Sequence, residues 1–387
     1  MNRVVKAYVG AQIHDGPVAH DTHALVVGQD GRFSVLHTNA LPQDCPITSL
    51  DGGLITPGFV DLQVNGGGGV MFNDDQSVAS LRVIAQAHAA LGTHALLPTL
   101  ITDTPERTRA AIDAVEQAVT EKIDGIVGIH LEGPHLSAAR KGAHDAGLIR
   151  PMSDKDLLLI IGAAERLPNV MVTVAPESTT LAQIRSMAAA GVIVSLGHTD
   201  ADASTCHAAF DAGARCVTHL FNAMSQLGNR EPGLVGATLA RGDIYAGLIA
   251  DGIHVHPTTI QIALAAKPHS ERIFLVTDAM ATAGAGIDSF LINGRKVFRK
   301  NHRLTLADGT LAGADLEMAR AVSVMIGDVG DNISSAVARA TSTPATLLRE
   351  PGDHGRISGS SRPVVHFQKG LSNPAARQTI FANPHCE

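Results

Sequence analysis

The sequence contains few aromatic residues and no concentration of positive charge. Aromatic side chains make up 3% of its 387 residues, with no Trp and two Tyr, so an aromatic-rich interaction surface is not expected. The formal net charge is −7 and no long basic run is present, which argues against nucleic acid or an anionic membrane as a partner. An anionic substrate would therefore have to be bound by locally placed cations and backbone amides.

Cysteine and long apolar runs are also scarce. The four cysteines, Cys45, Cys206, Cys216 and Cys386, form no CxxC pair, and we expect free thiols in a reducing compartment. No stretch of about 20 apolar residues could span a bilayer, and the N-terminal residues lack the apolar segment of a signal peptide. We therefore expect a cytoplasmic protein. The sequence has 45% hydrophobic and 17% charged residues, which is typical of a globular enzyme.

The order of short apolar runs predicts the fold class. Residues 1–56 contain strand-like runs, two of them separated by the hairpin signal Asp30-Gly31. Further runs then alternate with Ala-rich helical segments, which predicts βα units and a parallel sheet. There are eight of these runs, at 59–65, 93–100, 125–133, 170–177, 191–199, 214–222, 244–252 and 272–279. An α/β fold of the TIM type, the (β/α)8 barrel, requires this number of strands.

Three parts of the chain are expected from this pattern. Residues 57–350 would form the barrel, including a hairpin-rich insertion at 290–313. Two helical segments are expected after the insertion, near 314–327 and 332–349. Residues 1–56 would form the first part of a small β domain, and the strand-like segment 351–387 would form its second part.

Three strand ends carry residues of the kind that bind metal ions. Glu132 ends the third run, and His198 and His219 end the fifth and sixth. In a barrel the active site lies at the C-terminal ends of the strands, so these side chains would meet at one rim. Two imidazoles and one carboxylate form a common ligand set for catalytic zinc and leave a position for water. A single histidine is more often structural, but the shared placement favours a metal centre.

Asp278 ends the eighth run and has two interpretations. An Asp after a strand often only caps the helix that follows. In a metal hydrolase, however, an acidic residue beside the metal can take a proton from water and then deliver one to the leaving nitrogen. That double use suits the hydrolysis of an amide.

Three further residues in the predicted rim loops could carry positive charge. His144 follows the third run, Arg230 follows the sixth and His254 follows the seventh. An arginine offers a bidentate fork to a phosphate group, which suits a phosphorylated substrate. Without other information, each of the three could equally be a solvated loop residue.

A series of motifs in residues 51–350 resembles the N-acetylglucosamine-6-phosphate deacetylases of the amidohydrolase superfamily. The motifs are PGFVDLQVNGGGG, HLEGPH, KGAH, GHT, THLFNAM, REPGLVG, ADGIHV, VTDAM and GTLAG. The resemblance implies a (β/α)8 barrel with a small β-sandwich, and a homodimer whose subunits share the substrate pocket. It also implies metal-dependent hydrolysis of N-acetyl-D-glucosamine 6-phosphate to D-glucosamine 6-phosphate and acetate, in amino-sugar catabolism.

The resemblance assigns a role to individual residues. Glu132, His198 and His219 match the metal ligands of the family. Asp278 matches its catalytic acid and base, and His144 matches a residue near the substrate carbonyl. The positions that match its sugar-phosphate contacts are Ala143, Asn222, Ala223, Arg230, His254, Leu311, Ala312 and Gly313. Among these, the positions of Arg230 and His254 are expected to reach the phosphate across the dimer interface.

One departure from the superfamily pattern concerns the number of metal ions. Many amidohydrolases carry His-x-His at the end of the first strand and hold a second metal there, whereas this chain has Gln63-Val64-Asn65. An amide oxygen is a poor substitute for imidazole on zinc. We therefore expect one divalent ion per subunit, with Zn²⁺ as the first expectation and Fe²⁺, Co²⁺ or Mn²⁺ as compatible alternatives.

Three other functions stay open at this point. The substrate could be N-acetylgalactosamine 6-phosphate, which differs at a single hydroxyl group. The chain could instead hydrolyse a cyclic amide, as dihydroorotase and imidazolonepropionase do. It could also be a catalytically inactive barrel that serves as a binding scaffold, although the retained metal-binding pattern argues against this.

Overall fold

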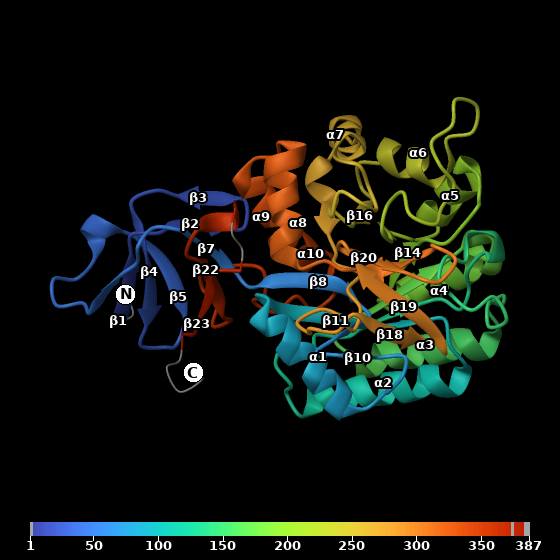
Figure 1. The fold of residues 1–387 in the computed structure, drawn as a ribbon, viewed down its shortest axis with the longest axis horizontal. Coiled ribbons are helices and arrows are strands. Elements are labelled where there is room, and N and C mark those ends of the chain that lie inside the picture. The colour runs from blue at the N-terminus through green and yellow to red at the C-terminus, as the bar shows by residue number, and fades with distance from the viewer. Residues whose placement is uncertain (1–2, 373–374, 383–387) are drawn as a thin grey trace.

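Eight parallel strands form a barrel at the centre of the larger part of the molecule, in a computed structural model that describes residues 3–372 and 375–382 (Figure 1). Their order in the sheet is β17-β16-β15-β14-β13-β12-β11-β8. They are β8 (Phe59–Val64), β11 (Thr93–Ile101), β12 (Ile129–Glu132), β13 (Val170–Val174), β14 (Ile193–Leu196), β15 (Cys216–Val217), β16 (Tyr245–Leu248) and β17 (Ile273–Leu275). Each of the eight predicted runs coincides with one of these strands, with β11 extending one residue beyond its run, so the predicted barrel is confirmed.

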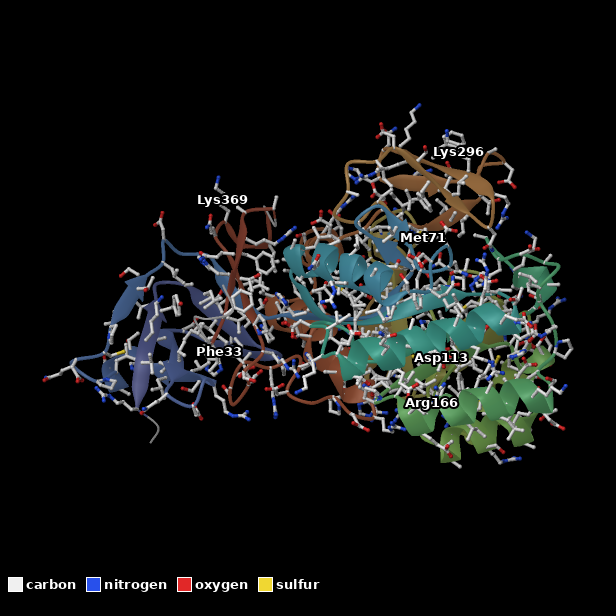
Figure 2. All side chains as sticks on the ribbon, turned by 90° about the horizontal axis from the view of Figure 1, so that it is seen from below. Phe33, Met71, Asp113, Arg166, Lys296 and Lys369 are labelled. Atoms are coloured by element: carbon white, nitrogen blue, oxygen red, sulfur yellow. The ribbon has the colours of Figure 1, made fainter. Side chains whose placement is uncertain are left out.

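Helices cover the outside of the barrel. Because both faces of the strands are thus buried, the strand sequences are nearly continuous apolar runs. The helices are α1 (Val78–Ala90), α2 (Pro105–Thr120), α3 (Asp154–Arg166), α4 (Leu181–Ala189), α5 (Ala203–Asp211), α6 (Gly233–Ala240), α7 (Pro257–Ala266), α8 (Met318–Val324), α9 (Ile333–Ala340) and α10 (Ser342–Leu347). Neighbouring helices also form ion pairs, as between Asp113 of α2 and Arg166 of α3, whose Oδ1 and Nη1 atoms lie 3.0 Å apart (Figure 2).

The starts of the helices follow local sequence signals. The side chains of Ser77 and Thr104 accept backbone hydrogen bonds at the starts of α1 and α2, and Ser153 forms a capping box with Asp156 at the start of α3. The two helical segments expected near 314–327 and 332–349 are more broken than predicted. A π-helical turn, Met325–Val329, follows α8, and the non-helical backbone of Thr341 separates α9 from α10.

The N- and C-terminal segments together form a small β-sandwich beside the barrel (Figure 1). One sheet has the order β5 (Phe33–His37), β4 (His23–Gly28), β1 (Val4–Val9) and β6 (Ile47–Ser49). The other has the order β23 (Arg377–Ile380), β22 (Val364–Phe367), β7 (Leu54–Pro57), β2 (Gln12–Asp15) and β3 (Val18–His20). Because β22 pairs antiparallel with β7, the C-terminal segment completes a sheet that the N-terminal segment begins. The apolar side chains between the sheets include Ile13, Leu25, Phe33, Ile55 and Val364.

An insertion after the last barrel strand forms its own antiparallel sheet. Its strands are β18 (Ser289–Ile292), β19 (Arg295–Lys300), β20 (Arg303–Thr305) and β21 (Leu311–Ala314). The Asn293-Gly294 turn joins the first two strands of the hairpin-rich insertion, with positive φ angles of 48° and 73° that a type I′ hairpin needs. The insertion packs through Ile292 and Val297 in an apolar cluster with Met71, which lies beside it in Figure 2.

Two predictions about the rest of the chain can be compared with the structure. Within residues 3–372 and 375–382, every helix is too short or too polar to cross a lipid bilayer. Cys45, Cys206 and Cys216 are free thiols, as predicted, while Cys386 lies outside the described residues.

Candidate active site

Three polar residues at the barrel rim have an unusual backbone conformation. The φ angles of His198, His219 and Asp278 are 47°, 29° and 51°, in the left-handed region that costs a non-glycine residue about 1–3 kcal/mol. Hydrogen bonds hold all three backbones in place, and the one at His219 runs from the Asn222 amide to the His219 carbonyl at 2.9 Å. The Ser137 amide donates to the carbonyl of His198 at 2.8 Å, and the Asp278 amide donates to the carbonyl of Gln63 at 3.0 Å. Such strain is typical of functional sites, where the surrounding structure fixes the direction of a side chain.

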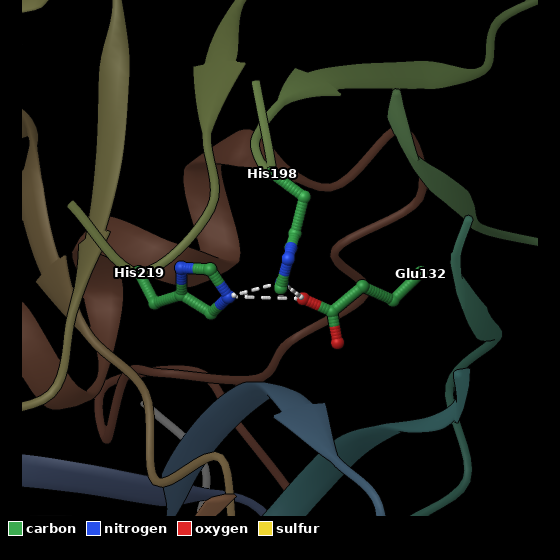
Figure 3. A group of neighbouring side chains, drawn as sticks. All are labelled: Glu132, His198 and His219. Carbon is green, nitrogen blue, oxygen red and sulfur yellow. Dashed lines mark hydrogen bonds and ion pairs between the residues drawn. The ribbon is translucent and has the colours of Figure 1, made fainter. Parts of the chain in front are cut away.

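Glu132, His198 and His219 meet in one buried cluster (Figure 3). Oε1 of Glu132 lies 3.0 Å from Nε2 of His219 and 3.2 Å from Nε2 of His198, and the two Nε2 atoms are 3.0 Å apart. The Nδ1 atom of His198 donates to the Arg140 carbonyl at 2.8 Å, so a neutral His198 ring has its lone pair on Nε2. A carboxylate oxygen and an imidazole lone pair thus face each other. A cation between them would remove the repulsion, so the donor set fits a metal ion.

The charges within the cluster of Glu132, His198 and His219 also favour a metal ion as its occupant. Burial opposes ionisation of Glu132, but when the rings of His198 and His219 are protonated, their hydrogen bonds and charges hold its pKa well below the usual range. Burial alone would lower the pKa of His219, but its hydrogen bond with Glu132 raises it. The cluster therefore contains an ionised carboxylate that needs positive charge beside it.

Two side-chain amides contact the carboxylates of the site, and one of them, that of Gln63, joins Glu132 to Asp278. Nε2 of Gln63 lies 3.3 and 3.2 Å from the two carboxylate oxygens of Glu132 and 3.2 Å from Oδ1 of Asp278. Nδ2 of Asn65 donates to the same Oδ1 atom at 2.6 Å. These amides therefore present N–H donors, not acceptor atoms, to both carboxylates. Burial and the charge of Glu132 raise the pKa of Asp278 to about 6.

His144 presents a hydrogen-bond donor to the cluster. Its Nδ1 atom accepts from the Thr102 backbone amide at 3.3 Å and lies 2.7 Å from the Thr102 hydroxyl group. Since Nδ1 accepts, the proton of the neutral ring is assigned to Nε2, which lies 4.0 Å from Oε2 of Glu132. Burial and the neighbouring His198 lower the pKa of His144 to about 3, so the ring is neutral over the physiological range.

The cluster opens into a cavity of ≈ 380 Å³, a volume that suits a small ligand. Most of the predicted site residues line it, namely Glu132, Ala143, His144, His198, His219, Asn222, Ala223, His254, Asp278, Leu311 and Gly313. These residues come from separate rim loops and from the insertion. The barrel thus brings together residues spread over nearly two hundred positions of the chain.

Three predicted residues lie elsewhere or differ in their surroundings. Ala312 does not line the cavity, because it is fully buried in the apolar cluster beneath the insertion. Arg230 lies on an exposed loop before α6 and also does not line it. His254 lines the cavity of its own chain, with its Nδ1 atom 2.6 Å from Oδ2 of Asp251. Its expected approach to the phosphate of a partner subunit stays a prediction.

Some residues of the site were not predicted from the sequence. Arg140 lines the cavity and pairs with Asp200 at 2.8 Å, and its position directly before the KGAH motif was an available signal. Arg295 of the insertion donates to the Ala143 carbonyl, and Thr102 contacts His144. No local pattern points to Arg295 or Thr102, since each contact joins segments that are far apart in the chain.

Comparison with known proteins identifies the family. Residues 54–358 match the amidohydrolase family. The chain belongs to the amidohydrolase family. Its barrel, its small β-sandwich and the resemblance noted from the sequence are all in accord with this assignment.

Relatives of this amidohydrolase act on two epimeric sugars, according to their names. An N-acetylgalactosamine-6-phosphate deacetylase of Shewanella sp. (strain ANA-3) is 44% identical over 80% of this chain and 77% of the relative. An N-acetylglucosamine-6-phosphate deacetylase of Haemophilus influenzae is 35% identical over 77% of this chain and 78% of the relative. The crystal structure of N-acetylglucosamine-6-phosphate deacetylase from Pasteurella multocida aligns with a TM-score of 0.90 at 33% identity, covering 98% of each chain.

A metal ion in the cluster of Glu132, His198 and His219 should stabilise the fold. After chelation, Zn²⁺ added at about 100 times its Kd should raise the free energy of unfolding by about 2.7 kcal/mol, seen as a higher Tm in thermal denaturation. In Glu132→Gln this shift should be lost, because an amide oxygen binds the ion poorly. Glu106→Gln, which changes an exposed carboxylate on α2, is the matched control. An undiminished shift in Glu132→Gln would exclude this cluster as the metal site.

Proposed function

We propose that the protein hydrolyses the N-acetyl group of N-acetyl-D-glucosamine 6-phosphate to give D-glucosamine 6-phosphate and acetate. The observation that carries the proposal is a buried Glu-His-His cluster beside a separately held carboxylate, Asp278, at one cavity. Named relatives that are 35% and 44% identical to this chain over the aligned residues are deacetylases of hexosamine 6-phosphates.

Glu132, His198 and His219 would hold one divalent ion, for which Zn²⁺ is the first expectation and Fe²⁺, Co²⁺ and Mn²⁺ are alternatives. When bound, such an ion supplies Lewis-acid activation of water and of the acetamide carbonyl. A single ion is supported by Gln63 and Asn65, whose N–H groups already face the carboxylates where a second ion would need acceptor atoms.

Asp278 would act as general base and then as general acid. Its Oδ1 atom accepts from Gln63 and Asn65, whereas its Oδ2 atom accepts no hydrogen bond from the described residues. The proton taken from the attacking water would therefore be held on Oδ2 and then given to the leaving nitrogen. A pKa of about 6 suits both tasks, because the group is mostly ionised at neutral pH and still basic enough to hold a proton.

The neutral His144 ring would donate from Nε2 to the acetamide oxygen. A preorganised N–H donor stabilises the negative charge that develops on this oxygen during attack. The burial of His144 and its contact with Thr102 support this role, because both keep the ring neutral and in one orientation.

The remaining cavity residues would bind the sugar phosphate. They are Ala143, Asn222, Ala223, His254, Leu311 and Gly313. We assign Arg230 to the phosphate of a neighbouring subunit in a homodimer. Its exposure and its absence from the cavity lining of its own chain support this assignment.

N-acetylgalactosamine 6-phosphate is the second candidate substrate. The observation in its favour is the 44% identity to the Shewanella enzyme that is named for this sugar. The two sugars differ at one hydroxyl group, and discrimination depends on whether a buried partner of that group is left unpaired. The same metal cluster and the same acid and base would serve both substrates.

The variant Asp278→Asn should separate proton transfer from binding. Its amide oxygen can still accept from Asn65, but its amide nitrogen cannot take up a proton. We expect kcat for acetate release to fall by about 10²–10⁴-fold, with metal content and substrate affinity unchanged. Asp51→Asn, at an exposed position, is the control. A wild-type kcat in Asp278→Asn would refute the proposed mechanism.

A comparison of three substrates tests the substrate assignment. Acetate release should be measured on both hexosamine 6-phosphates and on unphosphorylated N-acetylglucosamine. Two charge-assisted contacts of about 1.5–3 kcal/mol each predict a kcat/KM at least about 10²-fold higher for the phosphorylated sugar. Arg230→Met and His254→Gln should each reduce this preference.

Two results would change the assignment. Equal rates with and without phosphate would show that Arg230 and His254 do not bind it. A higher kcat/KM for N-acetylgalactosamine 6-phosphate than for its epimer would make the second candidate the substrate.

A further inference from the structure

Asp61 is a fully buried carboxyl group that the proposed mechanism does not use. It lies in the middle of β8 with 0% of its surface exposed. Its Oδ1 atom accepts from the backbone amides of Gln63 and Thr277, each at 3.2 Å, and its Oδ2 atom lies 2.5 Å from the hydroxyl oxygen of Thr277. Since burying a carboxyl group is costly, these three hydrogen bonds need an explanation.

The contacts of Asp61 cross the seam between the first and last strands of the barrel. Adjacent strands elsewhere in the barrel pair over at least two residues, and β12 and β13 pair over four. Between the ends of β8 and β17 the structure has an isolated bridge from Val64 to Ala279, and backbone hydrogen bonds cross the seam from Asp278 to Gln63 and from Asn65 and Gly66 to Ala279. The Asp61 side chain adds contacts with Thr277 directly before these backbone contacts begin, at a seam without a continuous ladder.

Gln63 and Asp278, two residues that flank the seam contacts of Asp61, also contact each other in the candidate active site. Gln63 follows Asp61 by two positions, and Asp278 follows Thr277 directly. The Asp278 amide donates to the Gln63 carbonyl at 3.0 Å, and the two side chains meet at 3.2 Å. A relative shift of the two strand ends would displace the base, and a misplacement of about 1 Å can reduce a rate about 10²-fold.

We infer that Asp61 is a positioning residue that holds Gln63 and Thr277 in register across the barrel seam. It thereby sets the contacts that Gln63 and Asn65 make with Asp278. This inference rests on the proposed function, because it assigns Asp61 a task only if Asp278 acts as the base.

The hydrogen bonds of Asp61 indicate which substitution of this residue should preserve its contacts across the seam. The hydroxyl oxygen of Thr277 accepts from the Ala279 amide at 3.2 Å, so it can also accept a proton donated by a neutral Asp61. Burial raises the pKa of Asp61 to about 7, which makes the neutral form accessible. An asparagine would reproduce that form, with one oxygen for the two backbone amides and one N–H donor for Thr277.

The test compares variants that remove or retain the seam contacts. Asp61→Ala should lower kcat at least about tenfold with KM changed less than about twofold, while metal content is unchanged. Asp61→Asn should keep kcat within about threefold of the wild type. Thr277→Val should fall between them, because it loses the hydroxyl group and keeps the backbone contact. Thr238→Val, which loses a buried hydroxyl group in α6, is the matched control.

A second measurement does not depend on activity. Amide hydrogen exchange at Thr277 and Asp278 should be faster in Asp61→Ala than in the wild type and near wild type in Asp61→Asn. If Asp61→Ala does not fold, Thr277→Val should show the faster exchange at Asp278 and the lower kcat.

The outcomes distinguish a failure of the Asp61 inference from a failure of the proposed function. Unchanged exchange and unchanged kcat in the seam variants would overturn the inference, as would an Asp61→Asn variant as impaired as Asp61→Ala. An inactive wild-type protein whose seam variants still show faster exchange would overturn the proposed function and leave the seam contact established.

Discussion

The site depends on one carboxylate oxygen that faces two imidazole nitrogens. Oε1 of Glu132 lies within 3.2 Å of Nε2 of both His198 and His219. The three residues end three different strands, so they meet only if the barrel closes with the correct stagger. The left-handed backbones of both histidines are a further cost of this arrangement. A cation is the occupant that best offsets these costs, because it converts the repulsion among the donors into attraction.

Asp278, a second carboxylate at the same cavity, has its pKa shifted in the opposite direction from that of Glu132. Protonated His198 and His219 lower the pKa of Glu132, while burial and the charge of Glu132 raise the pKa of Asp278. Gln63 lies between them and donates to both, which reduces their repulsion without adding charge. The environment thus gives two similar groups different tasks, one to bind a cation and the other to exchange protons.

The features that were predicted from the sequence are those that local patterns determine. Alternating apolar runs and helical segments indicate the barrel, and residues at the ends of strands indicate the rim. Glu132 and His198 could therefore be grouped from their positions at strand ends alone. The resemblance to known deacetylases added the sugar-phosphate contacts, most of which line the cavity.

The features that were not predicted depend on contacts between distant segments. Asp61 is a single polar residue within an apolar run, and only the closed barrel places it against Thr277. Thr102, directly after β11, and Arg295, on β19, likewise reach the KGAH loop from distant parts of the chain. Ala312 was expected at the substrate because its motif matched; its side chain is buried in an apolar cluster, which the sequence did not indicate, and its contact with substrate stays a prediction. Periodicity identifies an element, whereas these contacts follow from how the elements pack.

The metal content of the purified protein tests the central claim most directly. Elemental mass spectrometry, normalised to protein concentration, should give one divalent ion per chain in the wild type and in Asp278→Asn. It should give none in His219→Ala, because the cluster then loses one of its three donors. Two ions per chain in the wild type, or one ion retained in full by His219→Ala, would contradict the account.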